Sequence, residues 1–152
     1  MGTLLVHITC GPEAPTRAAL GLLVCRAAGD AGHQVNVFLA GDAVQLVRDA
    51  VLDSLSGLGT GSLRESFDGV VAKGGRLYVS GMSSKTRGVT DADLDGKPAE
   101  FAMPDRLVQL AFEADRTLTY CWVTSTFRSI SCTPTGLSSP RRTTSRISGN
   151  EP

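Results

Sequence analysis

The chain has 152 residues and a mass of 15.9 kDa, which suits a single domain. Hydrophobic residues make up 41% of the chain, which is enough to form a hydrophobic core. Fifteen basic residues balance fifteen acidic ones, so no net positive charge would attract nucleic acid. No apolar stretch approaches the ~20 residues of a membrane span, and the first residues lack the basic region of a secretory signal. We therefore expect a soluble, single-domain protein of the cytoplasm with neither a nucleic-acid nor a membrane partner.

Short apolar runs rich in β-branched and aromatic residues predict the strands. In chain order they are 4–8, 35–39, 76–80 and 116–120. Helical spacing of apolar residues, with Pro15 and Pro104 in first turns, predicts the helices. These helices are 13–31, a second from Gly41 through Val51, a third over 62–73, one turn at 90–94, and a last one from Pro104 to Ala114.

The connection between the second and third helices carries its own signals. Residues 54–61 contain three glycines and are expected to be a flexible linker, since a dinucleotide-binding glycine motif would directly follow a strand. Ser62 and Glu65 have the spacing of a capping box for the third helix. The alternation of strands and helices predicts a parallel sheet that is covered by helices on both faces.

In such a sheet the ligand site lies beyond the carboxyl ends of the strands. The segment after the third strand, 80–88, combines flexible glycines, hydroxyls that can cap a short helix, and two cations. It predicts a ligand-binding loop for a small anion, although a capped loop with solvated cations is an equal alternative. The candidate residues are Ser80, Gly81, Ser83, Ser84, Lys85, Arg87 and Gly88.

Four cysteines, Cys10, Cys25, Cys121 and Cys132, are widely and irregularly spaced. They form no CxxC pair and only two histidines accompany them, so we expect no metal site, no cofactor and no disulfide framework. Cys10 closes the first strand and is the candidate catalytic thiol, with packing as a small hydrophobe as the alternative.

The composition changes near residue 124. Residues 1–123 carry eleven Lys and Arg against fourteen Asp and Glu, a net charge of −3, whereas 124–152 carry four Arg against one Glu, a net charge of +3. The last 29 residues include seven Ser and six Thr without periodic apolar residues. We expect a folded domain over 1–123 and a disordered, dispensable tail over 124–152.

The folded part resembles the DsrE/DsrF-like sulfur-relay family, which includes the YchN and TusD types. The resemblance runs from Leu4 to Tyr120 and rests on the segments LLVHITCGPEAPTRAALGL, HQVNVFLAGDAVQLV, RLYVSGMSSKTRGVTDADL and ADRTLTY. The third segment is the most specific, because a loop of the form V-C-G-x-S/C-x-K-x-R-G-hydrophobic-T after a strand is characteristic of the family. The resemblance implies a three-layer α/β/α domain with a mainly parallel sheet of about four to five strands.

Family members commonly assemble into trimers or hexamers and pass persulfide sulfur between protein cysteines. The position that matches the sulfur-carrying cysteine is Ser80, and a second cysteine of some relatives matches Ser83. A hydroxyl cannot store persulfide sulfur. The resemblance therefore implies a homo-oligomeric, non-catalytic subunit or small-anion binder, and a sulfur-relay partner protein. The alternative is a persulfide-relay enzyme that uses Cys10 as a displaced nucleophile.

Overall fold

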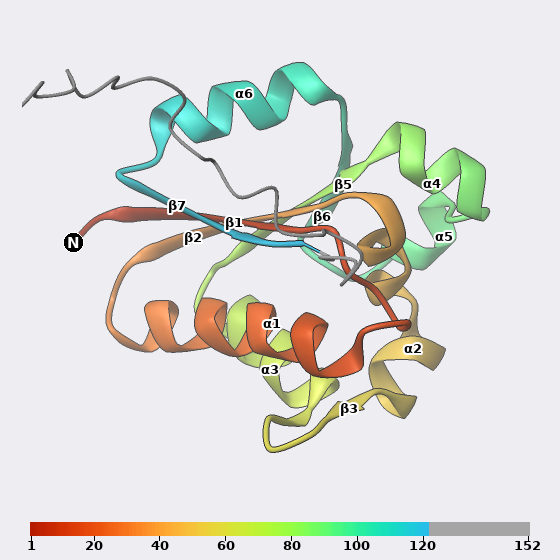
Figure 1. Cartoon of the computed structure of the whole chain (residues 1–152). Coiled ribbons are helices and arrows are strands. Elements are labelled where there is room, and N and C mark those ends of the chain that lie inside the picture. Colours follow the sequence, from red (N-terminus) through yellow and green to blue (C-terminus); the bar gives the residue numbers. More distant parts are fainter. Residues whose placement is uncertain (122–152) are drawn as a thin grey trace, which may run out of the picture.

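A computed structural model of the chain describes residues 1–121. Five parallel strands form the central sheet, in the order β6-β5-β2-β1-β7 (Figure 1). Their bounds are β1 Thr3–Ile8, β2 Gln34–Leu39, β5 Arg76–Ser80, β6 Ala99–Ala102 and β7 Arg116–Tyr120. The predicted α/β class is confirmed, and the five strands agree with the four to five that the resemblance implies, although the residue pattern predicted only four of them. The expected tail, 124–152, lies outside the described residues.

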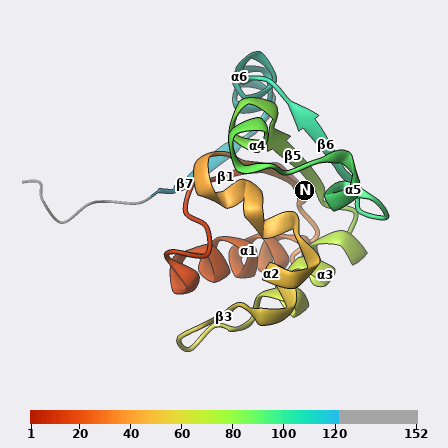
Figure 2. The ribbon, with the colours of Figure 1, turned by 90° about the vertical axis from the view of Figure 1, so that its right-hand side faces the viewer.

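Helices cover the sheet unequally on its two faces. Helices α1 (Pro15–Asp30) and α3 (Leu63–Ala72) lie on one face, and α6 (Pro104–Glu113) lies on the other (Figure 1). The shorter helices α4 (Gly81–Arg87) and α5 (Asp91–Leu94) lie beyond the carboxyl ends of the strands (Figures 1 and 2). The layers are therefore α/β/α, with the thicker helical layer on the side of α1.

The core is divided by the sheet. The main cluster lies on the α1 side and includes alternate residues of β1 and β2, such as Val6, Ile8 and Val37. The cluster under α6 has only five buried members: Leu5, Phe38, Tyr78, Ala102 and Leu110. Buried residues alternate between the two clusters along the strands, because successive side chains of a strand point to opposite faces of the sheet.

Three expectations about the middle of the chain were wrong. The single helix expected after Gly41 is divided into a 3-10 helix, η1 (Gly41–Val47), and the α-helix α2 (Asp49–Ser54). The expected flexible connection contains a small antiparallel hairpin, β3 (Ser56–Gly57) with β4 (Gly61–Ser62). Ser62 is held in that hairpin and makes no side-chain capping bond to α3.

Of two further short elements, the strand β6 was not predicted and the helix α5 was. Strand β6 was missed because AEFA is short and contains a charged residue, and its buried residue Ala102 has little hydrophobic signal. A capping box does form, at Thr90 and Asp93 of α5, where the Thr90 N–H donates to Asp93 Oδ2 at 2.9 Å. The helical turn predicted at 90–94 is confirmed.

Candidate functional site

Ser80 lies where strand β5 passes directly into helix α4. It is the last residue of the strand and the N-cap of the helix, and its side chain is nearly buried, with 8% exposed. Its Oγ accepts a hydrogen bond from the Ser83 N–H at 3.4 Å. The hydroxyl thus satisfies one of the free N–H groups at the start of the helix.

The next polar groups of α4 join it to the loop after β2. Ser83 Oγ accepts from the Gly41 N–H at 3.0 Å, and Arg87 Nε donates to Asp42 Oδ1 at 2.8 Å in an ion pair. These two contacts hold α4 against the start of η1. The predicted loop 80–88 is therefore mostly helix, and two of its predicted ligand groups are engaged within the protein.

The C-terminal end of α4 is also held by contacts within the protein. Gly88 ends the helix in the left-handed conformation, with φ 64°, which glycine adopts without a steric penalty. Arg48 Nη2 donates to the carbonyl oxygens of Arg87 and Gly88 at 3.0 and 2.7 Å. Among the described residues, Lys85 is the one cation of this segment that forms no ion pair, and its side chain is exposed.

An open depression of ≈ 510 Å³ lies beside α4. Ser84 lines it, but this side chain is 2% exposed and its Oγ has no hydrogen-bond partner within the described part of the chain. The hydroxyl is thus shielded from solvent as well as from a ligand in the depression. The lining residues are Gly81, Ser84, Lys85, Gly88, Val89, Thr90, Asp91 and Phe101.

Cys10 lies in a different place from Ser80. It is fully buried in the main core, and its Sγ donates a long hydrogen bond to the Tyr120 carbonyl oxygen at 3.8 Å. Burial raises the pKa of the Cys10 thiol, and Glu13 and Cys121 add to this effect, whereas a backbone hydrogen bond and Arg17 oppose it. Strand β2 lies between β1, which ends beside Cys10, and β5, which ends at Ser80, so the two predicted sites are separate.

Sequence reasoning did not single out Cys121. This exposed cysteine directly follows β7, and Arg17 Nη1 donates to its carbonyl oxygen at 3.4 Å. The signal for it was present, because the predicted strand 116–120 places the next residue at the carboxyl edge of a parallel sheet. What sequence reasoning lacked was the strand order, which puts β7 next to β1.

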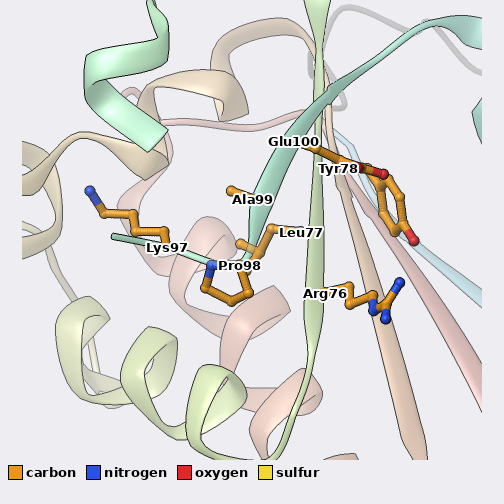
Figure 3. A pocket seen from close by; sticks show the side chains of 7 residues that line it. All are labelled: Arg76, Leu77, Tyr78, Lys97, Pro98, Ala99 and Glu100. Atoms are coloured by element: carbon orange, nitrogen blue, oxygen red, sulfur yellow. The ribbon is translucent and has the colours of Figure 1, made fainter. Parts of the chain in front are cut away.

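A second cavity lies at the opposite edge of the sheet. It has a volume of ≈ 370 Å³ and surrounds the start of β5 and the segment that leads into β6 (Figure 3). Lys97, one of its cations, is bound to Asp49 at 3.1 Å, while Arg106 lies over the Tyr78 ring at 5.2 Å. The cavity lies at the amino ends of these strands, whereas Ser80 lies at the carboxyl end of β5. Its lining residues are Arg76, Leu77, Tyr78, Lys97, Pro98, Ala99 and Glu100.

Within residues 1–121, no three His, Cys, Asp or Glu side chains are grouped so that they could hold a metal ion. No helix in the same part of the chain is long and apolar enough to cross a membrane.

Comparison with known proteins assigns the chain to a family. The model of the DsrE/DsrF-like family matches residues 3–120, and the chain belongs to this family. It is thus a member of a sulfur-relay-type family, as the residues of its four matching segments predict. A search of curated proteins finds no match.

Solved structures confirm the fold. The YchN protein of E. coli is 17% identical, with a TM-score of 0.65, over 79% of this chain and 100% of that chain. A conserved protein of unknown function from Bacteroides thetaiotaomicron is 13% identical, with a TM-score of 0.56, over 78% of this chain and 94% of that chain. The fold is therefore shared where little of the sequence is.

Proposed function

We propose that the protein is a non-catalytic, oligomeric subunit of the DsrE/DsrF-like family that no longer carries persulfide sulfur. The observation that carries this proposal is Ser80. The resemblance aligns this position with the sulfur-carrying cysteine, and here its side-chain oxygen caps α4 through the Ser83 N–H at 3.4 Å. A hydroxyl has no thiolate with which to accept sulfur, so the position is left with a structural role.

A small-anion site is less well supported at the same place. The Ser83 hydroxyl accepts from Gly41, and the charge of Arg87 is balanced by Asp42. The Ser84 hydroxyl is buried, which leaves Lys85 as the one exposed cation without an ion pair among the described residues of this segment. A single mobile lysine side chain does not make a preorganised anion site.

The surface of α6 supports the oligomeric part of the proposal. Only Leu110 of this helix is fully buried, while Met103 at its N-cap, Val108 and Phe112 are 52%, 54% and 88% exposed. Side chains of this kind on one helix mark an interaction surface. We expect a second copy of the chain to cover it, because homo-oligomers are the commonest way to bury such a face.

The alternative, persulfide relay through Cys10, has weaker support. The thiol is fully buried and its pKa is raised by that burial, so little thiolate forms at neutral pH and no solvent reaches the sulfur. A displaced nucleophile at this position would need the end of β7 to move away, because Cys10 Sγ contacts the Tyr120 carbonyl oxygen.

Sulfur loading of the full chain tests the proposal. The parent protein and Ser80→Cys are treated with inorganic polysulfide and digested with a protease. Mass spectrometry then measures the mass of each peptide that contains a cysteine. We expect an added sulfur on the peptide of residue 80 in Ser80→Cys, and none on the Cys10 peptide of either protein. Rapid loading of Cys10 in the parent would instead establish the relay function, and failure of Ser80→Cys to load would show that the site has lost more than its thiol.

A further inference from the structure

Two cysteines follow the ends of neighbouring parallel strands, at the carboxyl edge of the sheet. Cys10 follows the end of β1 and Cys121 follows the end of β7, and these strands pair from Leu4 with Arg116 to Ile8 with Tyr120. The pairing continues past the strand ends, because the Thr9 N–H donates to the Tyr120 carbonyl oxygen at 2.8 Å.

The same peptide group connects both cysteines. The Tyr120 carbonyl that accepts from Thr9 also accepts from Cys10 Sγ at 3.8 Å, and it belongs to the peptide bond that joins Tyr120 to Cys121. One peptide unit therefore separates the Cys10 sulfur from the backbone of Cys121. Arg17 of α1, which donates to the Cys121 carbonyl at 3.4 Å, holds that backbone beside the end of β1.

From this juxtaposition we propose that Cys10 and Cys121 form a reversible intramolecular disulfide when the protein meets a low-molecular-weight disulfide. The proposal is independent of the function of the Ser80 site, from which strand β2 separates it. It assigns different roles to the two thiols, because Cys121 is exposed and Cys10 is fully buried.

The reaction proceeds by two thiol–disulfide exchanges. The Cys121 thiolate attacks one sulfur of the small disulfide RSSR, forms a mixed disulfide with it and releases RS⁻. A local opening at the end of β7 then releases Cys10 from its contact with the Tyr120 carbonyl and lets its thiol lose a proton to solvent. The resulting Cys10 thiolate attacks Cys121 Sγ, which forms the Cys10–Cys121 bond and releases the second RS⁻. Two protein thiols lose two electrons and two protons, and RSSR is reduced to two RSH.

The position of the bond defines its effect on the fold. Within residues 1–121, strand β7 is an edge strand that pairs with β1 alone, and four of its five residues are exposed. A bond from Cys121 to Cys10 would fasten the end of this strand to the core cluster that contains Cys10. The oxidised protein should therefore unfold at a higher temperature than the reduced protein.

Oxidation of the full chain with oxidised glutathione tests this inference. Intact mass followed by peptide mapping under non-reducing conditions should show a loss of two hydrogens and a linked pair of peptides that contain Cys10 and Cys121. Dithiothreitol should restore the reduced mass. A stable glutathione adduct on Cys121 of the parent, or a link from Cys121 to Cys132, would overturn the proposal.

Cysteine variants separate the two steps. In Cys10→Ala, glutathione should accumulate on Cys121 because the second exchange is blocked, whereas in Cys121→Ser the Cys10 peptide should stay reduced. Cys25→Ala is the matched control for loss of a buried thiol, because Cys25 is also fully buried and its pKa is raised to about 12. This variant should form the Cys10–Cys121 link as the parent does, and Cys132→Ser should do the same.

Discussion

At the scale of single residues, Ser80 has two roles, because the residue ends a buried strand and its hydroxyl caps the helix that follows. We predict that Ser80→Ala lowers the free energy of unfolding by about 0.5–1 kcal/mol, because the Ser83 N–H loses its acceptor. Urea unfolding followed by circular dichroism measures the effect. Ser80→Thr keeps the oxygen and should recover most of the loss, and a Ser80→Ala protein as stable as the parent would show that the capping bond contributes nothing.

His7 is a second side chain whose contribution to stability can be measured, in this case through its dependence on pH. It lies in β1 and forms a T-shaped ring pair with Phe38, at a centroid distance of 5.8 Å, and its Nε2 has no partner within the described residues. Burial lowers the pKa of His7 below 6.5, so the unfolded chain binds its proton more readily than the folded chain. The contribution of neutral His7 to stability is therefore complete above pH ~6.5 and is lost as the pH falls through the lower folded pKa.

We predict that the parent loses stability between pH 6.5 and pH 5 more steeply than His7→Phe does. The difference between the two slopes should not exceed ~1.4 kcal/mol per pH unit, the value for one proton. Urea midpoints over this range provide the measurement. His33 is present in both proteins and cancels in the comparison, so parallel slopes would mean that His7 takes up its proton without cost in the folded state.

At the scale of elements, helix α1 lies unusually close to β1 at Gly21. A Cβ at this position would lie 2.7 Å from Ile8 Cδ1, which is too close for two carbon atoms. Gly21→Ala should therefore cost about 1 kcal/mol net, since overpacking outweighs the better helix propensity of alanine.

The clash has one identified partner, which permits a double-mutant test. Ile8→Val removes Cδ1 and leaves the milder contact of a γ-carbon, which in Ile8 lies 3.1 Å from the added Cβ, so Gly21→Ala should cost less in the Ile8→Val background than in the parent. Thermal or urea unfolding of the four proteins measures the coupling. Strictly additive effects would show that α1 adjusts its distance from the sheet instead of pressing on Ile8.

At the scale of the whole molecule, the exposed apolar side chains of α6 mark the surface where we propose that a second copy binds. We predict that the parent self-associates at micromolar concentration and that Phe112→Glu weakens self-association at least roughly tenfold, or about 1.4 kcal/mol. Phe112 is 88% exposed on α6, and burial of its ring is the gain that the substitution removes.

Sedimentation velocity over a concentration series provides the measurement. Leu58→Glu is the matched control, because Leu58 is 90% exposed but lies in the turn between β3 and β4, away from α6. It should associate as the parent does. A monomeric parent would remove the oligomeric part of the proposed function, and equal weakening by both variants would place the contact elsewhere.

How much could be predicted from the sequence differs between the elements. Strands such as β2 and helices such as α6 could be predicted locally, because apolar spacing and a proline in the first turn of the helix favour one structure regardless of distant residues. Strand β6 has no such local signal, and it forms because β5 offers a paired edge to Ala99–Ala102. The hairpin at Ser56 likewise replaced the expected capping box through pairing with Ser62.

Some features of the candidate site could likewise be predicted from the sequence, and others depend on the tertiary structure. The sequence alone determined the family and the α/β class, because these depend on residue identity and local order, and the proposal that Ser80 replaces a sulfur-carrying cysteine rests on the same resemblance. The tertiary structure decided which groups are engaged: Arg87 is bound by Asp42, which lies 45 residues earlier in the chain.

The two cysteines at the sheet edge show the physical reason for this division. Cys10 and Cys121 are 111 positions apart, and no periodicity or spacing links them. They become neighbours because the sheet places β7 beside β1, and Cys10 becomes buried because α1 and the core close over it. Residue type and local spacing are properties of the sequence, whereas strand order and burial depend on packing between distant segments, so only the folded chain could reveal this pair.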